Sequence, residues 1–169
     1  MAETTNAGNG GGQVNPGEAK QTQVRVIAQY IKDLSFENPN VKKLLENPGE
    51  PPDLRVEVNV NASKITDNAY ESAILLKAQA TSAKLGTIYD LELSYAGMFQ
   101  IENMPEQSME PFLLINCPSL LFPFARRIAA DLTREGGFPP LLLDPIDFAS
   151  LFVKRQQEKQ AQAAAKPAN

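Results

Sequence analysis

Acidic side chains lie an even number of positions apart in two stretches of the chain that are expected to be strands. They are Asp33 and Glu37 in the first stretch, and Asp90 and Glu92 in the last. Because successive side chains of a strand point to opposite faces, each pair shares the solvent side of its strand. If the two strands are neighbours, the four carboxylates form a negative patch that suits a basic protein partner. The alternative is an ordinary charged outer face that only keeps the sheet soluble.

The inventory of reactive side chains argues against an enzyme. The 169 residues contain no histidine, which removes the usual general base, the usual catalytic triad and imidazole metal ligands. A single cysteine, Cys117, cannot form a zinc site, and it has no basic neighbour in the sequence, so a buried thiol is expected. No glycine-rich phosphate-binding motif follows a predicted strand. We therefore expect no catalytic residue, no metal and no cofactor.

Four long runs alternate apolar and polar residues and predict strands. The clearest run is 54–63, where every even position is apolar and every odd position is polar. The other runs are 23–37, 70–83 and 87–101. Gly97 interrupts the last run and predicts a bulge or a kink. Consecutive antiparallel strands joined by loops predict a β-meander in which the four runs are neighbours in chain order.

Two helices packed on one face of this sheet are expected to follow, which makes the fold class α+β. The first carries an apolar stripe from Leu121 to Leu132, and the second is expected to begin at an N-cap Asp144 followed by Pro145. A sheet of such strands has an apolar face of about 850 Å², of which two helices of about 15 residues cover about half. The uncovered half must contact another subunit or an apolar client.

Composition and charge restrict the class of protein and its compartment. Hydrophobic residues make up 43% of the chain, which predicts a folded core. A net charge of −4 argues against nucleic acid as a main partner. No apolar run approaches about 18 residues, so no direct membrane insertion is expected. The first residues lack the basic and apolar regions of a signal peptide, which together with the single cysteine favours the cytoplasm.

The chain is expected to divide into three parts. Residues 1–22 are rich in Gly, Asn, Thr and Gln, which is typical of a disordered leader. Residues 23–155 hold the strands and helices and form one domain. Residues 156–169 are a polar C-terminal tail or a fraying helix end, and not core.

Three apolar residues outside the strands are candidates for a binding groove. Leu44 and Leu45 lie on a short amphipathic piece within the connection of about 15 residues between the first two strands, and connections of this length are usually functional or mobile. They fit a lid over a groove, and they fit a seal on the sheet edge equally well. Phe148, one of several phenylalanines near the helices, fits the groove or an ordinary core.

Three blocks of sequence, in order across residues 23–155, resemble one known family. The blocks are Lys32–Asn40, Glu92–Phe99, and Asn116–Arg126 continued by 137–141 and 144–152. In their combination they resemble SecB, a family of bacterial protein-export chaperones. The resemblance identifies residues 23–155 as a SecB-like chaperone domain.

This resemblance implies an assembly and a function. It implies a homotetramer, a dimer of dimers with helices between the sheets, that holds unfolded preproteins in long apolar grooves and delivers them to the motor ATPase SecA. Asp33, Glu37 and Glu92 match the acidic residues that receive the zinc-binding tail of SecA in this family. Asp90 departs from the pattern, because better-known relatives carry an apolar residue there. The groove is expected to include Leu44, Leu45 and Phe148.

Two other classes of function remain open to the residues alone. A small β-meander protein could use the groove for a lipid-like or other small molecule, and a purely structural oligomer would bind neither small molecules nor unfolded chains. A chaperone should bind many unrelated unfolded chains, whereas a carrier should bind one class of small molecule and ignore them.

Overall fold

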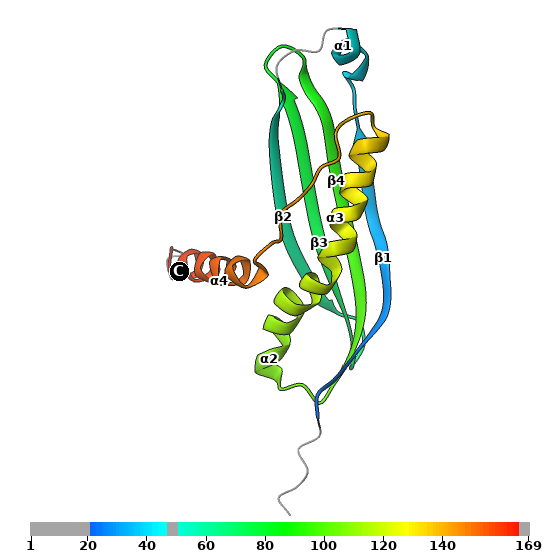
Figure 1. Ribbon diagram of the computed structural model, residues 1–169. Helices are drawn as coiled ribbons and strands as arrows, with labels where there is room; N and C mark the ends of the chain where they lie inside the picture. The colour runs from blue at the N-terminus through cyan, green and yellow to red at the C-terminus, as the bar shows by residue number, and fades with distance from the viewer. Residues whose placement is uncertain (1–20, 47–50, 166–169) are drawn as a thin grey trace, which may run out of the picture.

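The computed structural model describes residues 21–46 and 51–165, so all but the end of the predicted leader lies outside the described residues. Four strands form one antiparallel sheet: β1 (Gln23–Glu37), β2 (Asp53–Lys64), β3 (Ala69–Ser82) and β4 (Gly86–Glu102). The helical elements are α1 (Val41–Glu46), α2 (Glu106–Pro111), the π-helical turn η1 (Phe112–Asn116), α3 (Cys117–Glu135) and α4 (Phe148–Ala165) (Figure 1). The predicted α+β class, an antiparallel sheet followed by helices, is confirmed.

The strands lie in the order β1-β4-β3-β2. β2, β3 and β4 are neighbours in chain order, but β1 pairs with β4, so the prediction of a meander through all four strands is wrong at this one pairing. The connection that holds α1 must cross the end of the sheet from one edge strand to the other, a distance of about 14 Å at three strand spacings. This crossing explains why the connection is long.

Two bulges in β1 change which side chains share a face. Ile27 and Lys32 are each an extra residue relative to β4. The alternation reverses between them, so Tyr30 lies opposite Ala96 on the outer face and Ile31 turns to the helix side. A strict alternation from the start of the strand would have placed Tyr30 on the helix side.

The helical segment from α2 to α3 packs on β3 and β4 and forms the core with them (Figure 1). Gly97 allows this approach, because a Cβ at this position would lie 2.7 Å from Cδ2 of Leu121. The bulge predicted at Gly97 is found instead in the neighbouring strand, at Ile27. The glycine is therefore required by helix packing and not by a kink.

The helical segment begins earlier than the sequence pattern indicates. Residues Glu106–Glu135 are helical throughout, and the π-helical turn lies between Pro111 and Pro118. A proline removes a backbone donor and disturbs the helical hydrogen bonds around it. By length and composition alone this segment could cross a membrane, but nearly half of its apolar window is buried, which accounts for its apolar character.

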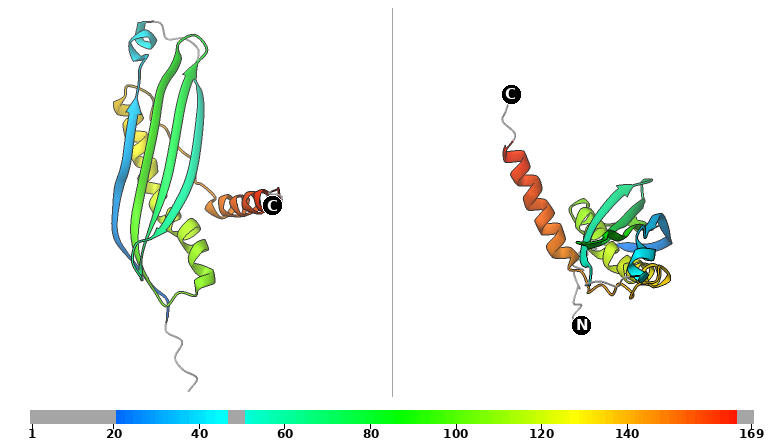
Figure 2. Two further views of the ribbon diagram at one scale, coloured as in Figure 1. Left: turned by 180° about the vertical axis from the view of Figure 1, so that it is seen from behind. Right: turned by 90° about the horizontal axis from the view of Figure 1, so that it is seen from above.

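The last helix differs from its prediction in both start and position. α4 begins at Phe148, and the carboxylate of Asp147 accepts a hydrogen bond from the Ser150 amide at 3.0 Å, so Asp147 and not Asp144 caps the helix. α4 then projects away from the sheet and continues to Ala165 (Figures 1 and 2). The prediction that two helices pack on one face is therefore correct for α3 and wrong for most of α4.

Candidate functional site

The pairing of β1 with β4 brings the four predicted carboxylates onto one surface. Glu37 lies directly opposite Asp90, and Asp33 and Glu92 lie opposite serines within the same ladder. Directly opposed residues of an antiparallel pair share a face, so all four carboxylates lie on the outer side of the sheet, away from α3. We refer to Asp33, Glu37, Asp90 and Glu92 as the acidic face.

Polar side chains from β2 and β3 border the acidic face. Lys77 Nζ lies 2.5 Å from Glu92 Oε1, and Gln79 Nε2 donates to Asp90 Oδ2 at 3.0 Å. A shallow hollow of about 210 Å³ opens here. Its lining consists of Arg55, Glu57, Lys77, Gln79, Asp90 and Glu92. The acidic face is therefore negative but has Lys77 and Arg55 of the same chain beside it.

A second polar cluster connects β1 to β3 over the intervening β4. The Glu71 carboxylate accepts hydrogen bonds from the Tyr30 hydroxyl and, at 2.6 Å, from Lys32 Nζ. The hydrogen bond to Glu71, and then burial, raises the pKa of Tyr30 to about 12. Lys32, and then Tyr30, lower the pKa of the Glu71 carboxyl below its ordinary value. Lys32 is thus paired with Glu71 and not with the acidic face.

Apolar side chains are exposed on the opposite, helix side of the single chain. Four come from β1 and two from α3: Val24, Val26, Ile31, Leu34, Leu120 and Phe124. The Phe124 ring stacks on Tyr95 with the ring centroids 6.3 Å apart. The helix side of β1 is therefore only partly covered within one chain, as the area argument predicts.

A groove runs along the free edge of β2 beside the start of α4. It has a volume of about 620 Å³, and its apolar wall consists of Val58, Val60, Leu75, Leu114, Leu151 and Phe152. A second hollow of about 400 Å³ lies between β2, α2 and α4 and shares Leu114 and Arg155 with the first. We call these two cavities the β2–α4 groove. Arg155 Nη1 donates to the Val60 carbonyl oxygen at 2.6 Å and so fixes α4 to the strand edge.

The residues predicted for a groove are not brought together in the single chain. Leu44 packs against the core from α1, while Leu45 beside it is 76% exposed. α1 lies at the end of the sheet far from α2 (Figure 1). Phe148 is only 2% exposed and packs edge-on against Phe122, so it supports the start of α4 and does not line the groove.

Leu151 and Phe152 do line the groove. Phe152 is one of the phenylalanines near the helices for which the sequence left a groove or an ordinary core open, whereas Leu151 was not predicted to line a groove. The feature of the sequence that indicates their position is their spacing of three and four residues from Phe148. A residue three or four positions after a core-facing residue lies on the same side of a helix, at the border of the core.

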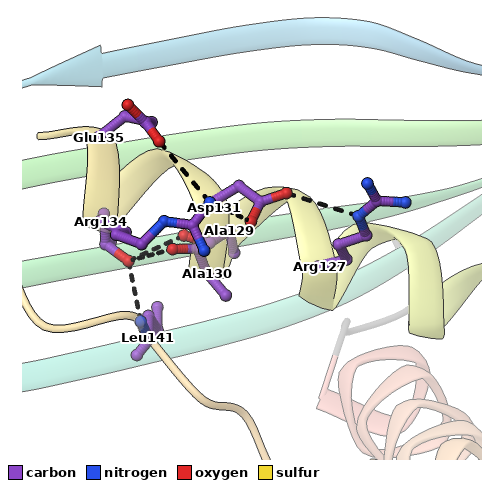
Figure 3. A network of polar contacts seen from close by, with 8 residues as sticks. Arg127, Ala129, Ala130, Asp131, Arg134, Glu135 and Leu141 are labelled. Atoms are coloured by element: carbon purple, nitrogen blue, oxygen red, sulfur yellow. Dashed lines mark hydrogen bonds and ion pairs between the residues drawn. The ribbon is translucent and has the colours of Figure 1, made fainter.

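Polar contacts of α3 fix the connection that leads to α4 (Figure 3). The buried Thr133 hydroxyl donates to the Ala129 carbonyl at 3.0 Å and accepts from the Leu141 amide at 2.8 Å. On the exposed side, Arg127 and Arg134 pair with Asp131 at 3.5 and 3.0 Å. The backbone is thereby held in an extended path along α3 that ends where α4 begins.

Within residues 21–46 and 51–165, no group of three or more His, Cys, Asp or Glu residues is arranged to hold a metal ion. Cys117 is buried, and this burial raises the pKa of its thiol to about 12, so the thiol stays protonated at neutral pH. The arrangement offers binding surfaces: a charged outer face and an apolar helix side.

Comparisons with known proteins agree on one family. Residues 17–159 match the family described as preprotein translocase subunit SecB. A protein-export protein SecB of Parvibaculum lavamentivorans is 48% identical over 165 residues, which cover 97% of this chain and 96% of the relative. The protein of the same name in Nitrobacter winogradskyi is 46% identical over 160 residues, which cover 94% and 98%.

A solved structure supports the fold. It is a SecB-like chaperone of Mycobacterium tuberculosis in complex with a ChAD peptide from an antitoxin, and it superposes with a TM-score of 0.55. The sequence identity is 17%, and the match covers 73% of this chain and 90% of that one.

Proposed function

This chain belongs to the SecB family of protein-export chaperones, and we propose that it holds preproteins unfolded on its apolar helix side and presents its acidic face to the SecA motor. Family membership, which the three sequence blocks predicted, is confirmed, and it favours an export chaperone over a carrier of lipids or other small molecules. A chaperone of this kind needs no catalytic residue and no cofactor.

The observation that carries the proposal for SecA is the pairing of β1 with β4. It gathers Asp33, Glu37 and Glu92, the family-matched carboxylates, on the side of the sheet that faces away from the helices. A negative face of this kind attracts a basic segment and orients it. Because the exposed apolar residues of β1 and α3 lie on the other side of the sheet, and the groove follows the distant edge strand β2, one molecule could hold a client and SecA together.

The β2–α4 groove supports the proposal for clients. An unfolded chain offers alternating apolar side chains and unpaired backbone groups. The groove combines an apolar wall with a free strand edge, so it can meet both needs. Burial of apolar area depends little on sequence, and we therefore expect low specificity. Leu44 and Leu45 extend this client surface if assembly brings α1 of one chain near the groove of another.

We further propose that the protein works in the cytoplasm as a homotetramer, a dimer of dimers. The exposed apolar residues of β1 and α3 support this assembly, because single chains rarely leave such surfaces open to water. The edge backbone of β1 is also free to pair with another chain.

The test of the SecA proposal is the triple variant Asp33→Ala, Glu37→Ala, Glu92→Ala. We expect SecA binding, measured by calorimetry, to weaken at least tenfold and to lose most of its salt dependence. The matched control replaces Asp67, Glu135 and Asp144, three exposed carboxylates outside both the acidic face and the β2–α4 groove, by Ala, and it should bind as the wild type does. Unchanged SecA binding by the first variant would mean that the acidic face only keeps the sheet soluble.

The test of the client proposal is the refolding of a slow-folding preprotein. The wild type and both triple variants should delay refolding equally, because a protein that binds only the unfolded state slows folding by mass action. A protein that leaves the refolding rate unchanged at excess concentration is not a holding chaperone.

A further inference from the structure

The acidic face contains a cation of its own, placed among its carboxylates. Lys77 on β3 lies directly opposite Glu92 of β4 on one side and Glu57 of β2 on the other. All three side chains therefore share the outer face. The Lys77 ammonium is 2.5 Å from Glu92 Oε1. Glu92 and Asp90 are the two carboxylates of the acidic face that also line the hollow beside it.

We propose that Lys77 is a built-in counter-ion of the docking surface, which occupies Glu92 in the free protein and is displaced by a basic segment of the partner. This inference rests on the proposed function of the acidic face and adds the residue that sets the affinity of that face. Lys77 itself does not bind the basic segment of the partner. It changes the affinity for that segment through its ion pair with Glu92.

The geometry makes Lys77 displaceable. The side chains of Lys77 and Glu92 are 56% and 50% exposed, so the ammonium can turn into solvent without opening the core. The hydrogen bond to Glu92, and then the charges of Glu92, Asp90 and Glu57, raise the pKa of Lys77 above its ordinary value, so it remains a cation wherever the partner's lysines do. An arriving ammonium or guanidinium group therefore competes with Lys77 for the same oxygen.

Two other cations lie near the acidic face, Lys32 and Arg55, and their surroundings differ from those of Lys77. Lys32 binds Glu71, whose side chain is only 12% exposed and also accepts a hydrogen bond from Tyr30. Displacing Lys32 would leave a nearly buried carboxylate with one fewer partner, which is unfavourable. Arg55 lines the hollow beside the acidic face, but it lies on β2, the edge strand furthest from β1. Lys77 is thus the cation whose removal frees a carboxylate of the acidic face.

The experiment compares SecA affinity for the wild type and for Lys77→Gln. Exposed ion pairs are weak, so we expect binding to tighten by about two- to fivefold in the variant. The gain should be larger at low than at physiological ionic strength, because the freed charge of Glu92 is screened by salt. If Lys77 only stabilised the sheet, its replacement by Gln would weaken SecA binding. Lys77→Arg keeps the cation and should bind SecA as the wild type does.

Lys64→Gln is the matched control. It removes the same charge and also breaks an exposed ion pair, Lys64–Asp67 at 3.5 Å, but Lys64 lies on the helix side, opposite Tyr70. SecA affinity should be unchanged in this variant. Urea unfolding of each variant checks that the fold is retained.

Equal or weaker SecA binding by Lys77→Gln would overturn the counter-ion role of Lys77. Equal gains in Lys77→Gln and Lys64→Gln would overturn it too, because they would show an effect of net charge and not of position. A wild type that does not bind SecA would refute the docking function, and the role of Lys77 with it. The wild-type titration separates this last outcome from the others.

Discussion

Glu71 joins strands that are not neighbours. Its carboxylate on β3 accepts hydrogen bonds from Tyr30 and Lys32 of β1, and β4 lies between them. Two features make this contact possible: the bulges of β1 turn Tyr30 outward, and the residue of β4 beneath it, Ala96, is small. Asp33 follows Lys32 directly, so the cluster also fixes the start of the acidic face.

Replacing Tyr30 by Phe should destabilise the protein by about 1 kcal/mol near neutral pH, because the hydrogen bond to Glu71 is lost. This stabilisation also depends on pH. The pKa of Tyr30 is raised from 10.0 to about 12 in the folded protein, so the stabilisation is fully present below about pH 10 and is lost as the pH rises toward 12. Urea unfolding of the wild type and Tyr30→Phe should give stability curves that converge over this range. If the two curves stayed parallel over this range, deprotonation of Tyr30 would not remove a stabilising hydrogen bond to Glu71.

Gly97 matters for a different reason, namely the distance between α3 and the sheet. A Cβ at this position would lie 2.7 Å from Leu121 Cδ2 and 2.9 Å from Phe99 Cε2, and both neighbours are fully buried. Gly97→Ala should therefore lower the free energy of unfolding by about 1–3 kcal/mol in urea titrations. Adding Leu121→Val shortens the opposing side chain, and the loss in the double variant should be smaller than the sum of the two single losses. Simple additivity would argue against a clash between these two positions.

At the scale of elements, the sequence predicts the strands well and their pairing poorly. The alternation at 54–63 marks β2, and the predicted bounds of the first strand coincide with β1. Alternation works because each strand has one apolar face, and this is a property of the strand alone. It does not encode the partner. The one hint that β1 pairs elsewhere was the length of the connection to β2, since a hairpin would need only a short turn.

The starts of the helices were missed for two physical reasons. Three prolines at 111, 118 and 123 are typical of loops, yet the chain stays helical through them, with a π-helical turn that absorbs part of the mismatch. Asp144 and Asp147 are both good N-cap residues. The choice between them is set by tertiary contacts, because Thr133 holds Leu141 and keeps the backbone extended past Asp144. No local pattern records that contact.

The crossover element α1 gives a test of the predicted client residues. Leu44→Ser together with Leu45→Ser should weaken binding of an unfolded preprotein by roughly tenfold, because apolar area is lost from the client surface. The native mass and the affinity for SecA should not change. Leu142→Ser is the matched control, since Leu142 is 79% exposed, close to the 76% of Leu45, but lies on the connection between α3 and α4.

The outcomes of this test distinguish three roles for α1. Unchanged client affinity would show that Leu44 and Leu45 only seal the sheet edge. A fall in native mass would instead make them subunit-interface residues. An equal effect of Leu142→Ser would show that any exposed leucine contributes and that α1 has no special position.

At the scale of the whole molecule, the sheet separates two kinds of surface. Its outer side carries the acidic face, while its other side carries α3, the exposed apolar residues of β1 and the approach to the β2–α4 groove. The sequence predicts this division, because alternation fixes the two faces and the helices are too few to cover one of them. It does not predict that α4 leaves the sheet, which follows from the path of the preceding connection (Figure 2).

The incomplete cover of β1 leads to the prediction for assembly. A long edge strand with exposed apolar side chains and free backbone groups favours pairing with another chain. Four chains of 18.5 kDa would have a mass of about 74 kDa, and light scattering at low micromolar concentration should give this value.

Val26→Glu with Ile31→Glu places two charges on the helix side of β1 and should reduce the mass, because burying unpaired carboxylates is unfavourable. Leu142→Glu, with one charge on the exposed connection, should leave the mass unchanged. A wild type that scatters as a stable 18.5 kDa monomer would refute both the tetramer and the argument from uncovered apolar area.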